Sequence, residues 1–80
     1  MNMSREQFIV MMPYITNSLA AMIARRQALS EADAVIRLYE SKLYTLLEQE
    51  ETKVWQYSTE MLYTLFVQEQ QTGSIVFPDV

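Results

Sequence analysis

The sequence predicts an all-α protein: a small three- or four-helix bundle with an extended C-terminal tail. Apolar residues recur every three or four positions along three stretches, which is the spacing of one helix face. A serine suited to cap a helix precedes each stretch, at Ser4, Ser30 and Ser58. One glycine and two prolines are too few for the many turns of a β-rich fold. The 80 residues, 1–80, form a single helical domain without repeats or linkers.

The first helix is predicted over residues 5–27. Its apolar stripe comprises Phe8, Met11, Met12, Ile15, Leu19, Met22 and Ile23. Pro13 lies within the stripe, where it removes one backbone donor and clashes with the preceding turn. The helix therefore either kinks at Pro13 or ends there and restarts, and we expect one kinked helix because the stripe keeps its phase. Val10 and Tyr14 lie on the opposite side, together with several alanines.

The central helix is predicted over residues 31–50, with Ser30 as its N-cap. Its apolar stripe comprises Ala32, Val35, Ile36, Tyr39, Leu43, Leu46 and Leu47. Leu38 and Tyr44 fall outside this stripe and give the helix a second apolar side. The sequence leaves open a break near Glu40 to Lys42, because Tyr-Glu-Ser favours a helix less than its flanks do.

The segment after the central helix, residues 51–58, is rich in residues that favour extended structure. It contains the only tryptophan, Trp55, which we expect to be largely buried and to plug one end of the bundle.

The last helix is predicted over residues 58–71, with Ser58 as N-cap and Gly73 in a left-handed C-cap. The tail after it alternates, with Ile75 and Phe77 facing inward. It either lies on its own bundle or reaches to a partner.

Composition excludes several kinds of chemistry. The chain has no cysteine and no histidine, so it lacks disulfides, thiol chemistry and the commonest metal ligand. Net charge is −4, and the acids concentrate after residue 47, which disfavours contact with nucleic acid or anionic lipid. The acidic cluster Glu48, Glu50 and Glu51 is expected to be a solvated helix end, and neither a cofactor nor a metal is expected.

The apolar run FIVMMPYI, from Phe8 to Ile15, is too short to cross a membrane and lacks the features of a signal peptide. We therefore expect no membrane partner and a cytoplasmic location.

Two runs, SKLYTLLEQEETKVWQYS and QTGSIVFPD, resemble a small bacterial helical family of unknown function. The resemblance covers about residues 29–79. Its matching positions are Ser41, Lys42, Tyr44, Leu47, Glu48, Glu50, Thr52, Lys53, Trp55, Ser58, Thr72, Gly73, Phe77 and Pro78. It implies a short bacterial cytoplasmic protein without an assigned activity. Similar reading frames are associated with toxin–antitoxin-like neighbourhoods.

Five tyrosines and six methionines are the most informative side chains for function. Both types are used at adaptable protein surfaces, and both equally form a core and its border. We predict a non-catalytic protein–protein interaction module, either a homodimer or a heterodimer. The expected partner-binding residues are Val10, Tyr14, Leu38, Tyr44, Ile75 and Phe77. The alternative is an antitoxin-like or other regulatory subunit associated with nucleic acid. No constellation of residues predicts an enzyme.

Overall fold

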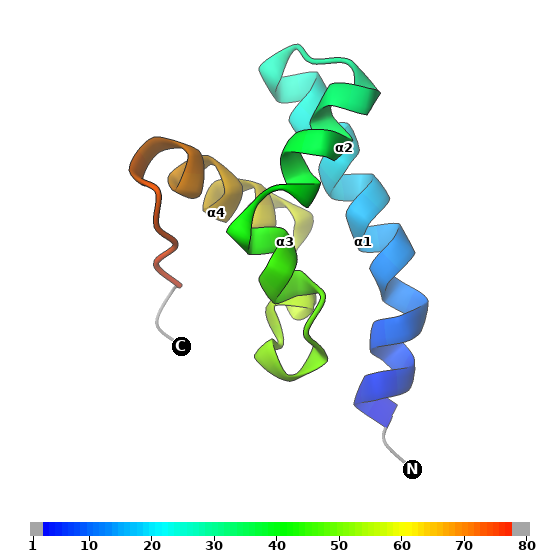
Figure 1. Cartoon of the computed structure of the whole chain (residues 1–80). Coiled ribbons are helices and arrows are strands. Elements are labelled where there is room, and N and C mark those ends of the chain that lie inside the picture. The colour runs from blue at the N-terminus through cyan, green and yellow to red at the C-terminus, as the bar shows by residue number, and fades with distance from the viewer. Residues whose placement is uncertain (1–2, 78–80) are drawn as a thin grey trace.

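Four α-helices and two short 3-10 turns make up residues 3–77, the part of the chain that this computed structural model describes, with side chains from Arg5 onward (Figure 1). The α-helices are α1 (Met3–Gln27), α2 (Glu31–Tyr39), α3 (Lys42–Leu47) and α4 (Thr59–Thr72). The 3-10 turns η1 (Glu50–Thr52) and η2 (Val54–Gln56) connect α3 to α4. The described residues form no strand, so the predicted all-α class is confirmed.

Helix α1 is continuous through Pro13, which confirms one helix and excludes two separate ones. Its 25 residues extend about 37 Å at 1.5 Å per residue, nearly the 42 Å length of the molecule. Ala28, at φ 55°, then reverses the chain, and Ser30 caps α2 by accepting from the Asp33 amide at 3.1 Å. Helix α2 therefore runs back along α1 (Figure 1), and Ser30 acts as the N-cap that the sequence predicts.

The prediction of one central helix over residues 31–50 is wrong, because the chain breaks at Glu40 and Ser41. The Ser41 hydroxyl donates to the carbonyl of Leu38 at 2.6 Å and accepts from the Tyr44 amide at 3.0 Å. One serine therefore satisfies the end of α2 and the start of α3. The break is the alternative that the sequence left open.

A carboxylate from α4 completes the cap of α3. Glu69 accepts from the backbone amides of Lys42, at 2.8 Å, and Leu43, at 3.0 Å. These two charge-assisted hydrogen bonds join segments more than 25 residues apart in the sequence. The position of the break is thus fixed by tertiary structure as well as by Ser41.

The break also changes which side of α2 faces the core. Ala34 and Leu38 are fully buried, whereas Ile36 and Tyr39 are more than half exposed. The predicted stripe over α2 is wrong at Ala32, Ile36 and Tyr39, which are exposed, whereas Val35 packs against the core as predicted. The predicted stripe keeps the phase of the α3 leucines, which requires a continuous helix. Leu38 consequently belongs to the core, and its expected place in a partner-binding face is wrong.

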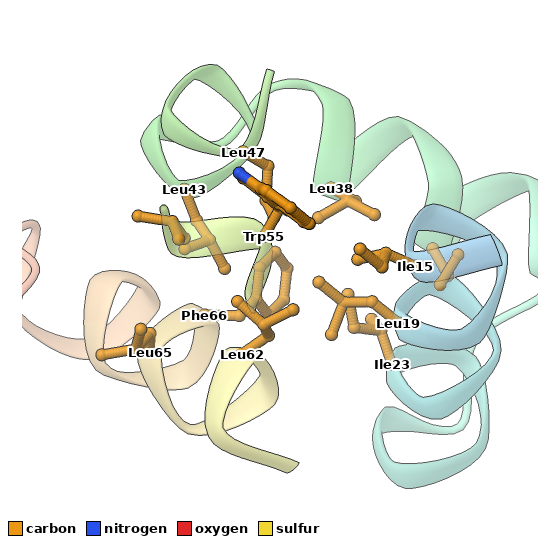
Figure 2. Packing of buried hydrophobic residues seen from close by; sticks show 13 residues of the cluster. Ile15, Leu19, Ile23, Leu38, Leu43, Leu47, Trp55, Leu62, Leu65 and Phe66 are labelled. Atoms are coloured by element: carbon orange, nitrogen blue, oxygen red, sulfur yellow. The ribbon is translucent and has the colours of Figure 1, made fainter. Parts of the chain in front are cut away.

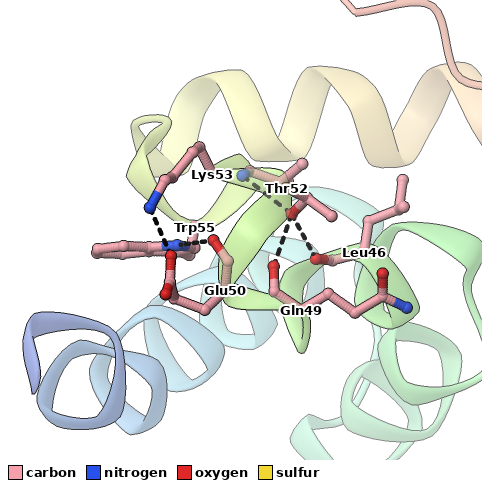
Figure 3. A network of polar contacts seen from close by, with 7 residues as sticks. Leu46, Gln49, Glu50, Thr52, Lys53 and Trp55 are labelled. Atoms are coloured by element: carbon pink, nitrogen blue, oxygen red, sulfur yellow. Dashed lines mark hydrogen bonds and ion pairs between the residues drawn. The ribbon is translucent and has the colours of Figure 1, made fainter. Parts of the chain in front are cut away.

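Residues 51–58 form compact turns, so the predicted extended structure is wrong. The Thr52 hydroxyl lies 2.8 Å from the carbonyl oxygens of both Leu46 and Gln49, and its proton is shared between them (Figure 3). This side chain ties the first turn to the end of α3. Local hydrogen bonding of this kind outweighs the β-propensity of the segment.

Trp55 holds the two turns together from inside. Lys53 takes a left-handed conformation at φ 60° between them, and the Trp55 indole N–H donates to the Glu50 carbonyl at 3.0 Å (Figure 3). Only 5% of Trp55 is exposed, which confirms its predicted burial.

All four helices and the second turn contribute to one hydrophobic core (Figure 2). Its larger members are Ile15, Leu19, Ile23, Leu38, Leu43, Leu47, Trp55, Leu62, Leu65 and Phe66. Every buried side-chain nitrogen or oxygen in the described residues has a hydrogen-bond partner. The core is therefore closed without unsatisfied polar groups.

The last helix has the predicted caps. Ser58 accepts from the Met61 amide at 3.1 Å, and Gly73, at φ 77°, donates to the Glu69 carbonyl at 2.8 Å. The tail then turns back onto α4, where the Val76 amide donates to the Gln68 side chain at 2.8 Å. Of the two alternatives for the tail, it lies on its own bundle.

Candidate functional site

The N-terminal half of α1 carries the most prominent exposed apolar surface of the molecule. From Gln7 to Ala24 the chain has eighteen residues without a charged side chain. Three large apolar residues in this run are mostly in solvent: Ile9 is 60% exposed, Val10 73% and Tyr14 67%. Scattered apolar side chains on a surface need no explanation, but a cluster on one uncharged stretch of a helix does.

The inward side of α1 explains why these residues point outward. Phe8 meets the Trp55 ring edge-on, with centroids 5.6 Å apart, and Ile15 is buried in the core. Successive residues are rotated by about 100° around a helix, because each turn holds about 3.6 residues. Fixing Phe8 and Ile15 on the core side therefore turns Val10 and Tyr14 to the opposite side.

A groove of about 430 Å³ lies between α1 and the α2–α3 junction. Its lining is Ile9, Met12, Pro13, Thr16, Asn17, Tyr39 and Tyr44. The two tyrosine rings contact each other with centroids 4.6 Å apart. Burial raises the pKa of Tyr44 above its ordinary 10.0, and the Glu48 carboxylate and Tyr39 add to the rise. The phenol is thus neutral at physiological pH.

We define the α1 apolar face as four exposed residues of α1, Ile9, Val10, Pro13 and Tyr14, together with the two tyrosines across the groove, Tyr39 and Tyr44. Tyr39 is 52% exposed. If a large side chain presents about 200 Å², the four most exposed members leave roughly 500 Å² in solvent. That is near the upper end for the largest apolar patch of an ordinary monomer, about 300–600 Å².

The structure separates the expected partner-binding residues into three groups. Val10, Tyr14 and Tyr44 lie on the α1 apolar face. Leu38 lies in the core, as described above. Ile75 and Phe77 belong to the tail, which α3 and α4 separate from α1 (Figure 1).

The two tail residues contact their own bundle. Ile75 packs against the core, and the Phe77 ring stacks on Tyr57 with centroids 6.4 Å apart. They line a different hollow, of about 460 Å³, beside Lys42 and Leu46.

Sequence reasoning missed three members of the face: Pro13 was placed only within the core stripe, and the other two are Tyr39 and Ile9. Tyr39 was expected on the core stripe, and Ile9 was assigned to neither side of the first helix. The run without charges from Gln7 to Ala24 was the available signal. A helix on the surface of a bundle ordinarily carries charges on its outer side, so their absence over five turns marks an outer side with another use.

The three carboxylates of the acidic cluster, Glu48, Glu50 and Glu51, do not converge on a common site. Glu50 pairs with Lys53, while Glu48 and Glu51 are exposed. Within residues 5–77, no three His, Cys, Asp or Glu side chains are placed to share a metal ion.

Helix α1 also bears on the membrane question. Its segment Arg5–Gln27 is long and apolar enough to cross a membrane, so the expectation of too short an apolar run, which considered only Phe8 to Ile15, is wrong. Core helices of water-soluble proteins meet the same criterion. Leu19 and Ile23 are fully buried against the other helices, whereas only 33% of the apolar window as a whole is buried.

No family model matches the chain. No curated protein and no solved structure shows significant similarity to it. The resemblance over residues 29–79 stays a prediction, and Pro78, one of its positions, lies outside the described residues. The arrangement of this chain's own side chains therefore carries the functional argument.

Proposed function

We propose that the chain is a non-catalytic interaction module that binds a protein, or a second copy of itself, through the α1 apolar face. The observation that carries this proposal is the exposure of Ile9, Val10 and Tyr14 on a helix without charge from Gln7 to Ala24. Burying roughly 500 Å² of apolar surface stabilises a complex by up to about 12 kcal/mol before the costs of association, at about 25 cal/mol per Å².

The composition of the face supports a protein partner. Tyrosine is enriched in the centres of protein interfaces, and charged residues are depleted there. Tyr14, Tyr39 and Tyr44 each combine a flat apolar ring with a hydroxyl that can hydrogen-bond at the border of a contact. The helix that carries the face is fixed in place, because Phe8 and Ile15 pack the inner side of α1 against the core.

The alternative of a regulatory subunit associated with nucleic acid stays a prediction, and the cations give it little support. Arg26 is engaged by Glu60 and lies 5.1 Å from the centre of the Tyr63 ring. Lys42 donates to the Gly73 carbonyl at 2.9 Å. A nucleic-acid surface needs clustered cations that can reach phosphates, and these two are used within the fold.

Site-specific photo-crosslinking in cells tests the proposal. A photoreactive phenylalanine replaces Tyr14 in one variant and Gln71, an exposed residue of α4, in the control. We expect discrete protein adducts from position 14 and none of the same mass from position 71. Adducts that are absent, identical at both positions, or composed of nucleic acid would overturn the proposal.

A further inference from the structure

We infer that the α1 apolar face is closed by a second copy of the chain, with the two α1 helices antiparallel across a two-fold axis. The inference rests on the proposed function and names its partner. It follows from three features of the outward side of α1: its area, the order of large and small residues along it, and the placement of charge at its ends.

The exposed area fits a small symmetric dimer. A standard interface covers about 800 Å² on each partner, and homodimer interfaces are about 65% apolar. Val10 and Tyr14 supply the centre of that apolar share, Ile9 and Tyr39 extend it on the groove side, and polar neighbours such as Thr16 and Asn17 supply the remainder. An 80-residue chain without disulfides has a small core, and chains of this size are often stabilised by association.

On the outward side of α1, the large residues lie in the N-terminal half and the small residues lie in the C-terminal half. Val10 and Tyr14 project from its N-terminal half, whereas Asn17 and Ala21 leave its C-terminal half low. A hollow of about 210 Å³ lies at that low end, between α1 and α2, lined by Asn17, Ala20, Ala21, Glu31 and Val35. The same side of one helix therefore carries both a projection and a recess.

If a second copy of α1 runs antiparallel to the first, the projecting half of each helix faces the recess of the other. Val10 of each copy then lies over the recess beside Ala21 of the other, and Tyr14 lies close to the two-fold axis near its own symmetry mate. Two-fold contacts are self-complementary in this way, and they close the assembly at two copies. A parallel pair would instead set Val10 against Val10 and leave both recesses empty.

Charge favours the same arrangement. No charged group of α1 between Gln7 and Ala24 loses water on contact, and the one charged residue that lines the recess is Glu31 of α2. In an antiparallel pair, Arg5 and Glu6 of one copy lie at the same end as Arg25 and Arg26 of the other, and the two helix dipoles oppose each other, which is the favourable term. A lipid surface suits the chain less well, because its net charge is −4 and α1 is held in the core by Leu19 and Ile23.

Cysteine cross-linking tests the geometry cleanly, because the native chain has no cysteine. Tagged Val10→Cys and untagged Ala21→Cys are mixed at micromolar concentration and oxidised, with each variant alone as the matched control. A disulfide needs Cα atoms about 4.4–6.8 Å apart. The antiparallel pair brings position 10 to position 21 of the other copy, but leaves the two positions 10 about 16 Å apart along the helices.

We expect the mixed disulfide to form at least about tenfold faster than either symmetric one, because a bound pair has a local concentration far above micromolar. Wild type is expected to sediment as a dimer, and Val10→Asp as a folded monomer with an unchanged circular dichroism spectrum. Faster Val10→Cys homodimers would show a parallel pair and overturn the inference.

A monomeric mass with no disulfide in any mixture would also overturn it. If adducts from position 14 persisted in cells in that case, the proposed function would stand with a different chain as partner. Co-sedimentation of wild type, but not Val10→Asp, with phosphatidylcholine–phosphatidylglycerol vesicles would assign the face to lipid and overturn both.

Discussion

Replacing Trp55 by alanine tests the central packing argument most directly. The indole is 95% buried, contacts Phe8 edge-on, and donates its N–H to the Glu50 carbonyl. The substitution removes the side chain that joins the N-terminal half of α1 to the two 3-10 turns. The expected result is a large loss in the free energy of unfolding together with loosening of α1 before Ile15.

The size of the loss follows from buried area. A tryptophan buries about 150–250 Å², which at about 25 cal/mol per Å² corresponds to about 4–6 kcal/mol. Alanine keeps part of that burial and the surroundings relax, so we expect about 3–5 kcal/mol, the range measured for aromatic truncations in cores. A chain of 80 residues is ordinarily stable by about 4–12 kcal/mol, so this single change brings it close to unfolding.

Urea titration followed by far-ultraviolet circular dichroism measures the effect, since the substitution removes the only tryptophan fluorophore. Trp55→Phe is the matched control, because it keeps a ring against Phe8 and removes the N–H together with only part of the ring volume. The Glu50 carbonyl also accepts from the Lys53 amide, at 3.1 Å, so the control should cost only about 1–2 kcal/mol. A loss below about 1 kcal/mol for Trp55→Ala would refute the packing described here.

Three further predictions address other parts of the chain. Glu69→Gln should lower the free energy of unfolding by about 1–2 kcal/mol in a thermal melt, because the cap of α3 loses its charge. The control Glu60→Gln, on the surface, should lower it by under about 1 kcal/mol. Equal losses for the two variants would argue against the cap. Ala28→Gly should stabilise by about 0.5–1 kcal/mol, since Ala28 sits at φ 55°, and destabilisation in urea would contradict this. In a difference titration against Tyr44→Phe, the Tyr44 phenol should ionise above pH 10.0, because its pKa is raised on folding. The contribution of this group to stability is therefore complete below pH 10.0 and is lost as the pH rises through the folded pKa.

Local signals predicted much of the fold. The caps at Ser30, Ser58 and Gly73 are determined by side chains within three residues of the backbone groups they satisfy or by a single backbone angle. Such features can be read from a short window of sequence. The burial of Trp55 could be predicted because it is a large aromatic side chain and the only tryptophan in the sequence.

What the sequence missed depends on contacts between distant segments. The carboxylate of Glu69, on α4, accepts hydrogen bonds from the first amides of α3, and no local sequence pattern predicts this contact. Once the break at Ser41 is placed, the core positions of α2 rotate to Ala34 and Leu38, and Tyr39 turns to solvent. One error of continuity therefore produced both the wrong stripe and the wrong assignment of Leu38 to a binding face.

The interaction surface was predictable only in part for a related reason. Periodicity placed Val10 and Tyr14 opposite the core, since both lie on one uninterrupted helix. Tyr39 and Tyr44 instead line a groove with Ile9 and Pro13 of α1, and their positions depend on where α2 ends and α3 begins. A surface built from three helices cannot be derived from the pattern of any one of them.

The cap supplied by Glu69 also bears on the order in which the chain folds. Helix α3 has only six residues, far fewer than the 12–15 that an isolated helix needs to be even marginally stable in water. Its first amides are satisfied only after α4 has delivered its carboxylate, although α3 is synthesised first. The hairpin of α1 and α2 can therefore form early and locally, whereas α3 waits for the last helix. In native-state hydrogen exchange, the amides of α3 should open together with the C-terminal half of α4, as one cooperative unit.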